Sequence, residues 1–148
     1  SETGYGVNYS GIEGLSLSYA VTDENTHAGS DTSGDNTVIK ASYAYGPVTV
    51  AYSEMEHDEG LSSGANDITM TSYALTYTMS DELSVTYGSE TSDKGSKTTD
   101  LEVEGISVAY TTGGMTISAS SMSLENGNWG TGSEEDMDYW ALGASFAF

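Results

Sequence analysis

One short alternation of apolar and small polar residues returns four times, and it constrains the fold more than any other feature of the chain. It reads Leu-Ser-Leu-Ser-Tyr at 15–19, Val-Thr-Val-Ala-Tyr at 48–52, Leu-Ser-Val-Thr-Tyr at 83–87 and Met-Thr-Ile-Ser-Ala at 115–119. The starts of the four copies are 33, 35 and 32 residues apart. A period of two residues places alternate side chains on opposite faces of a β-strand. The pattern therefore predicts strands with one large apolar face and one small polar face.

The connections between these strands alternate in length. Each copy of the pattern follows a short turn of Gly, Pro, Asp or Ser, the residues that tight turns favour. Longer stretches rich in Gly, Ser, Asn and Asp lie at 23–36, 56–67, 90–99 and 125–137. Short and long connections in strict alternation predict nine antiparallel strands of about 7–12 residues each. The short turns lie at one end of the sheet and the long loops at the other.

The same alternation is found in soluble β-sandwiches, whose apolar face is buried against a second sheet. Three features favour a membrane instead. The polar face carries Ser, Thr, Ala and Gly where soluble sheets carry Lys, Glu and Arg, and the connections run strictly up and down. Five strands also end on an aromatic residue near a turn or the terminus, as an interfacial girdle does. This predicted girdle consists of Tyr9, Tyr45, Tyr77, Tyr110 and Phe148. We therefore expect an all-β, transmembrane antiparallel up-and-down β-barrel region over residues 1–148, with no transmembrane helix.

Composition removes several classes of function. The formal net charge is −20, from 23 acids against 3 basic residues, which argues against nucleic acid as a partner. The chain has no cysteine, so neither disulfides nor thiolate metal sites are expected. No segment matches a calcium-binding loop, and the clustered acids are interpreted as solvated loop residues. His27 and His57 are predicted in separate loops, Trp129 in a loop and Trp140 in the girdle. We predict no catalytic residue, no metal site, no cofactor and no enzymatic activity, since no nucleophile elbow occurs.

The N-terminal segment has neither a basic region nor an apolar core of a signal peptide, which is typical of a processed chain or an excised piece. The last ten residues, Tyr-Trp-Ala-Leu-Gly-Ala-Ser-Phe-Ala-Phe at 139–148, resemble the C-terminal β-signal of bacterial outer-membrane proteins. Residues 5–20 are similar to a strand–turn–strand hairpin of general diffusion porins, those of Gram-negative and alphaproteobacterial type. The resemblance implies an assembly signal, read by the barrel assembly machinery, at Trp140, Leu142, Phe146 and Phe148.

The resemblance also implies a location and partners. The protein is expected in the bacterial outer membrane, with the C-terminal Phe and the short turns at the periplasmic side and the long loops outside. Porins of this family are homotrimers surrounded by lipid and lipopolysaccharide, and they carry no cofactor. The function implied is passive diffusion of small hydrophilic solutes through a water-filled channel.

Nine is an odd number, whereas bacterial single-chain barrels have even strand counts. Two arrangements remain open. The chain is the C-terminal part of a barrel of about 16 strands, or residues 15–148 form an eight-stranded barrel preceded by a lead-in. The small inner residues favour the wider barrel, because side chains fill the interior of an eight-stranded one. The eight-stranded alternative would act in adhesion or surface recognition through its acidic loops.

In the wider barrel, ten residues are predicted to line the pore. They are Lys40, Ser42, Thr49, Ser53, Thr76, Ser84, Thr86, Ser107, Thr116 and Ser118. The chain has no arginine, and Lys40 is the one cation that this register directs inward. Unless the missing half of the barrel supplies basic residues, the wall is predicted to be net acidic and the channel to prefer cations.

Overall fold

The computed structural model describes residues 3–25, 33–60, 63–132 and 135–147, the described residues below. Nine strands and one short helical turn account for most of them. The elements are β1 (Thr3–Tyr9), β2 (Leu15–Asn25), β3 (Ser33–Tyr45), β4 (Val48–Asp58), β5 (Ile68–Thr78), β6 (Leu83–Lys94), β7 (Leu101–Thr112), β8 (Met115–Glu125), η1 (Gly127–Trp129) and β9 (Met137–Phe146). No helix among the described residues is long and apolar enough to cross a membrane.

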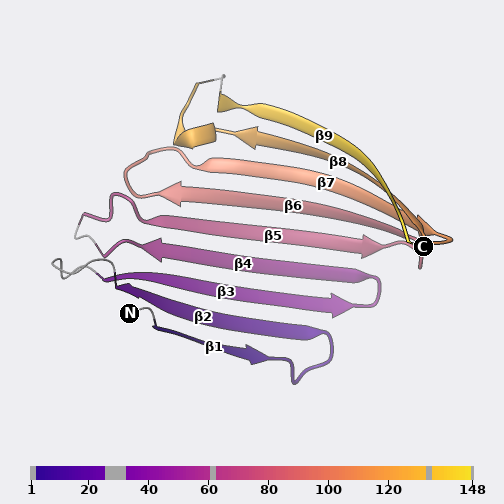
Figure 1. The fold of residues 1–148 in the computed structure, drawn as a ribbon, viewed down its shortest axis with the longest axis horizontal. Coiled ribbons are helices and arrows are strands. Elements are labelled where there is room, and N and C mark those ends of the chain that lie inside the picture. Colours follow the sequence, from indigo (N-terminus) through magenta and orange to yellow (C-terminus); the bar gives the residue numbers. More distant parts are fainter. Residues whose placement is uncertain (1–2, 26–32, 61–62, 133–134, 148) are drawn as a thin grey trace.

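The strands form one antiparallel sheet in the order β1-β2-β3-β4-β5-β6-β7-β8-β9, each hydrogen-bonded to the next along the chain. Figure 1 shows a curved, open sheet with the short turns at the right and the long connections at the left. The predicted nine-stranded up-and-down arrangement is confirmed. The eight-stranded alternative is wrong for this structure, because β1 pairs with β2 from Thr3 to Tyr9 and the sheet ends at β9 without closing.

The strands run farther toward the loops than the sequence predicts. The segments predicted as loops at 56–67 and 90–99 supply the last residues of β4 and β6, which end at Asp58 and Lys94. The segment 23–36 likewise contributes to β2 and β3. Acidic and polar residues are common in loops but do not end a strand, because a strand is extended by hydrogen bonds between backbone groups and not by its side chains.

The short turns follow the expected chemistry. Gly14 adopts a φ of +77°, in the left-handed region that favours glycine, and its carbonyl accepts a hydrogen bond of 2.8 Å from the Ala44 backbone N–H. A Cβ at this position would collide with the Ala44 carbonyl oxygen. The glycine therefore fixes both the β1–β2 turn and its contact with the adjacent β3–β4 hairpin.

The described residues contain no buried hydrophobic core. Large apolar side chains are exposed instead, for example Tyr45 at 76% and Leu142 at 71%. A β-sandwich would cover such a face with a second sheet packed about 10 Å away. In the described part of the chain no second sheet exists, so the apolar face is left uncovered by protein.

Candidate functional site

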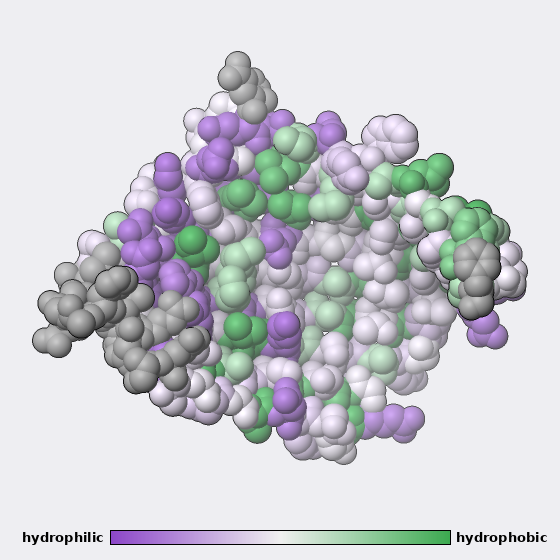
Figure 2. Space-filling model, in the orientation of Figure 1, coloured by the Kyte–Doolittle hydropathy of each residue, from purple (hydrophilic) through white to green (hydrophobic). Residues whose placement is uncertain are grey.

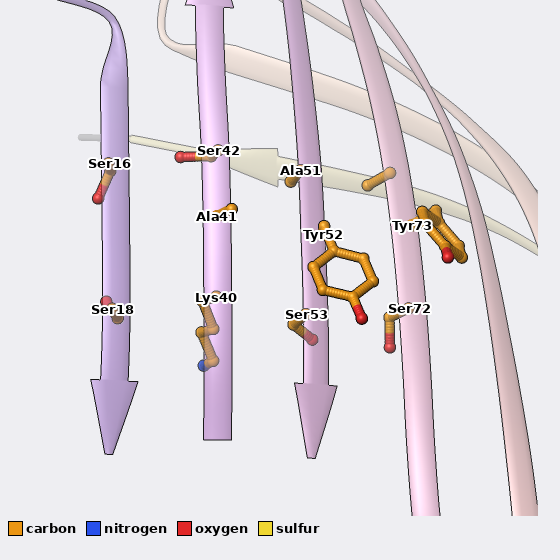
Figure 3. A pocket seen from close by; sticks show the side chains of 11 residues that line it. Ser16, Ser18, Lys40, Ala41, Ser42, Ala51, Tyr52, Ser53, Ser72 and Tyr73 are labelled. Atoms are coloured by element: carbon orange, nitrogen blue, oxygen red, sulfur yellow. The ribbon is translucent and has the colours of Figure 1, made fainter. Parts of the chain in front are cut away.

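The small polar side chains share one face of the sheet, which we call the inner face. Figure 3 shows two of its cross-strand rows, Ser16–Ser42–Ala51 and Ser18–Lys40–Ser53–Ser72. The register places all ten residues predicted to line a pore on this face. They are Lys40, Ser42, Thr49, Ser53, Thr76, Ser84, Thr86, Ser107, Thr116 and Ser118.

The inner face is the more enclosed of the two. Along β7 the residues alternate between half-buried and exposed, and the half-buried ones, including Val103, Ser107 and Ala109, point inward. Side chains converge on the concave side of a curved sheet and spread apart on the convex side, so the inner face is the concave one. Two hollows indent it, one of about 380 Å³ beside Lys40 and one of about 400 Å³ beside Glu90.

Polar side chains on the inner face form hydrogen bonds with one another across the strands. The Ser18 hydroxyl donates to Asn8 Oδ1 at 2.7 Å. The Oγ1 atoms of Thr76 and Thr86 lie 2.9 Å apart, and so do those of Thr111 and Thr116. In the half nearest the short turns this surface is polar and largely uncharged, and it is chemically suited to contact with water.

The charges on the inner face differ from those predicted. Lys94 joins Lys40 there, because β6 alternates without interruption to its end, and Glu90 points the same way. The described side chains of this wall therefore carry charges of both signs, from Lys40, Lys94 and Glu90. His57 lies on the inner face of β4, with Nδ1 2.6 Å from Asn36 Oδ1, and not in a loop as predicted. His27 lies outside the described residues.

Trp129 is a connection residue, as predicted, and it anchors η1 to the end of β6. Its Nε1 donates a hydrogen bond of 2.8 Å to the Ser92 carbonyl oxygen, and Lys94 Nζ lies 5.3 Å from the centre of its ring. Ser92 is 4% exposed and is the buried polar residue of the described chain. Nearby, burial raises the pKa of Asp100, and a hydrogen bond to Asp93 and the charge of Glu102 raise it further.

The opposite, outer face carries the large apolar side chains near the short turns. Four of the five girdle residues are described there and are exposed by 39–76%: Tyr9, Tyr45, Tyr77 and Tyr110. Phe148, the fifth, lies outside the described residues. A second set of outward aromatic residues lies farther from the turns: Tyr19, Tyr52, Tyr73, Tyr87 and Trp140. The sequence analysis does not distinguish this set from the girdle. The sequence contains a local signal for this second set: four of its five members lie two residues from an acid, Ser or Thr, which the alternation places on the same face.

Acidic side chains occupy the outer face beyond this second set, at the loop ends of the strands. Glu54 and Glu56 on β4 and Glu102 and Glu104 on β7 are examples. The Tyr52 hydroxyl donates to Glu54 Oε2 at 2.6 Å, which ties the aromatic set to the acids. Figure 2 shows hydrophilic residues gathered over the loop ends, at the left. No group of three or more His, Asp or Glu side chains among the described residues is arranged to hold a metal ion.

The residues of the predicted assembly signal lie on the outer face of β9, an edge strand. Trp140, Leu142 and Phe146 are exposed by 76%, 71% and 61%. They alternate with inward residues such as Gly143, which pairs with Ser118. The fourth residue of the signal, Phe148, is outside the described part of the chain.

The comparisons with known proteins concern the fold. No protein-family model matches the chain, and no curated protein matches it. A solved structure that does match is a porin refined at 1.8 Å resolution, with a TM-score of 0.69 and 18% sequence identity. The alignment covers 95% of this chain and 50% of the porin, so the chain spans about half of that protein's length. At this identity the likeness shows the fold: a porin-like, all-β, up-and-down antiparallel sheet.

Proposed function

We propose that this chain forms part of a closed transmembrane barrel, and that the barrel is a water-filled channel for passive diffusion of small hydrophilic solutes. One observation carries the proposal: in the half nearest the short turns, a single curved sheet exposes large apolar side chains on its convex face and small hydroxyl side chains on its concave face. Lipid is the solvent that favours the first face, and water the second. A channel needs no bond to be made or broken, so no catalytic group is required.

The direction of the strands favours a barrel completed by further strands over one closed by direct pairing of β1 with β9. Odd-numbered strands run toward the short turns, so the two edges, β1 and β9, point the same way. Pairing them directly would give a parallel ladder. An all-antiparallel barrel therefore needs an odd number of additional strands, and seven would complete a barrel of about 16. The likeness to half of a porin is consistent with this number.

For selectivity we propose a cation preference that originates at the mouth. The described inner face holds Lys40, Lys94 and Glu90, whereas acids crowd the loop ends and the loops. Carboxylates around an entrance raise the local concentration of cations without lining the narrowest part of the channel.

We further propose the bacterial outer membrane as the location, with the short turns and the C-terminus in the periplasm. The exposed row Trp140, Leu142 and Phe146, continued by Phe148, is proposed as the feature that the barrel assembly machinery reads. Lipid and lipopolysaccharide against the outer face and a homotrimeric state complete the proposal.

A cysteine-labelling experiment tests which face meets water. The chain has no native cysteine, so Ser42→Cys and Leu17→Cys give one thiol each, on adjacent strands and opposite faces. In vesicles containing the whole protein purified from its own outer membrane, a membrane-impermeant thiol reagent should modify Ser42→Cys at least about tenfold faster. Equal rates would contradict the assignment of the two faces.

Planar-bilayer recordings of the same preparation test the channel itself. Stable open current steps, with a reversal potential in a KCl gradient that favours K⁺, are expected. A sealed barrel without current would overturn the function. A boiled mass near 15.5 kDa would show that no further strands belong to the protein.

A further inference from the structure

Two glycines lie side by side on the inner face; Gly88 leaves a gap in the cover of side chains, and the Met122 side chain lies against Gly105. Gly88 on β6 pairs directly with Gly105 on β7. They form the floor of the hollow of about 400 Å³, which is within the size range of small-molecule sites. A Cβ at Gly88 would meet only the Tyr73 carbonyl oxygen, at 3.7 Å, so backbone packing does not require glycine there.

A carboxylate stands at the edge of this glycine floor, one cross-strand row nearer the loops. The Ser72 hydroxyl donates a 2.7 Å hydrogen bond to Glu90 Oε2 and fixes the side chain across the β5–β6 ladder. Lys94, the cation on the same face of β6, holds its ammonium over Trp129 instead. The carboxylate therefore carries its negative charge into the hollow without a basic side chain from its own strand to neutralise it.

The remaining walls separate into an apolar side and a hydroxyl side. Val103 pairs with Glu90 and lines the hollow beside it, and Met122 pairs with Gly105. Thr86 and Ser107 form the row on the turn side. A thioether and a branched alkyl group beside a carboxylate suit a ligand that combines a positive charge with an apolar group.

We propose that this hollow is a binding site for small organic cations, namely ammonium ions that carry an alkyl group. The inference rests on the proposed channel, in which the inner face is the wall of the lumen. The ammonium group donates hydrogen bonds to Glu90, and the alkyl group covers Val103 and Met122 above the glycine floor. Such a site slows a passing solute and does not trap it, because binding in a channel must be weak enough for release.

The test uses n-butylammonium as the probe on the whole protein purified from its outer membrane. Binding is measured in detergent micelles by saturation-transfer NMR, and current reduction is measured in planar bilayers. Methylammonium, with charge but almost no alkyl group, and n-butanol, with the alkyl group but no charge, are the matched probes. Glu90→Gln removes the charge, and Gly88→Val fills the hollow from a position where the backbone leaves room. The control is Glu104→Gln, which removes one negative charge from the outer face of the adjacent strand.

We expect n-butylammonium to bind with a millimolar dissociation constant and to bind about tenfold more weakly in Glu90→Gln and Gly88→Val. Glu104→Gln should bind as the wild type does. Equal binding of methylammonium and n-butylammonium, or an unchanged affinity in Gly88→Val, would overturn the site. Because the NMR measurement does not need an open channel, loss of current with intact binding would overturn the proposed channel and leave the site standing.

Discussion

The two halves of β7 have opposite polarity. In the half nearest the short turns, β7 directs Ile106, Val108 and Tyr110 outward and Ser107 and Ala109 inward. In the half nearest the loops the same strand directs Glu102 and Glu104 outward and Leu101 and Val103 inward. The two-residue alternation continues along the whole strand, but the faces on which the polar and the apolar side chains lie are exchanged between the two halves.

Other strands repeat this inversion. On β4 the outward Tyr52 is followed by Glu54, and the inward Ser53 is followed by Met55. Charged side chains are costly in hydrocarbon, by about 2.5–3.5 kcal/mol each at the centre of a membrane. Alternation alone identifies a strand with two faces. The position along the strand at which the outward residues become acidic marks the edge of the proposed lipid-facing zone.

The largest expected effect comes from placing a charge in the turn half. Val108→Lys should lower the free energy of unfolding in lipid vesicles by about 2–4 kcal/mol, because in the proposed barrel an ammonium would replace an apolar group that faces hydrocarbon. Glu104→Lys, on the same face but in the loop half, should change it by less than about 1 kcal/mol. Urea titration of both variants measures the difference, and equal losses would remove the distinction between the halves.

Next in size is an effect of backbone conformation at the two ends of the sheet. Gly14→Ala at the turn end should cost about 2 kcal/mol, because φ is +77° and the new Cβ meets the Ala44 carbonyl oxygen. Gly132→Ala at the loop end meets no atom within 4 Å and should stay within about 0.5 kcal/mol of the wild type. The same unfolding titration compares them. If the two variants lost equal stability, the turn end would not be the more tightly constrained one.

A smaller difference separates the two tryptophans. Trp129→Phe removes the hydrogen bond to the Ser92 carbonyl oxygen and should cost about 1 kcal/mol. Hydrogen exchange of the amides at the end of β6 should also become faster. Trp140→Phe on the exposed outer face of β9 keeps an aromatic ring and should change stability by less than about 0.5 kcal/mol. Unchanged exchange at the end of β6 in Trp129→Phe would show that η1 does not hold this strand.

The smallest effect is a pH dependence confined to the loop end. The pKa of Asp100 is raised from 3.8 by burial and by Asp93 and Glu102, so the folded protein binds the proton more tightly than the unfolded chain does. This contribution to stability is present at low pH and is lost as the pH rises through the raised pKa. Asp100→Asn should therefore melt slightly above the wild type at pH 7, by about one degree, and the difference should shrink toward pH 4. A difference independent of pH would show that the carboxyl group does not cause it.

Strand number, order and the two faces could be predicted from the sequence because they depend on local features. A period of two residues and turns built on glycines such as Gly14 and Gly114 act within a few residues of the chain. Once each hairpin pairs with the next, the ten inward residues fall on one face without further information. The positions of the girdle tyrosines relative to the turns are also local, so they could be read directly.

The loop ends of the strands, and with them the candidate site, were decided by tertiary structure. The sequence predicts Glu90 and Lys94 in a loop, but both belong to β6, because backbone pairing with β5 continues through them. The Ser72–Glu90 hydrogen bond and the Gly88–Gly105 pair join residues 17 or 18 positions apart, and only the register between neighbouring strands brings them together. Whether the sheet closes depends on what pairs with its two edge strands, β1 and β9. Such pairing joins segments far apart in the chain, so no local sequence pattern encodes it.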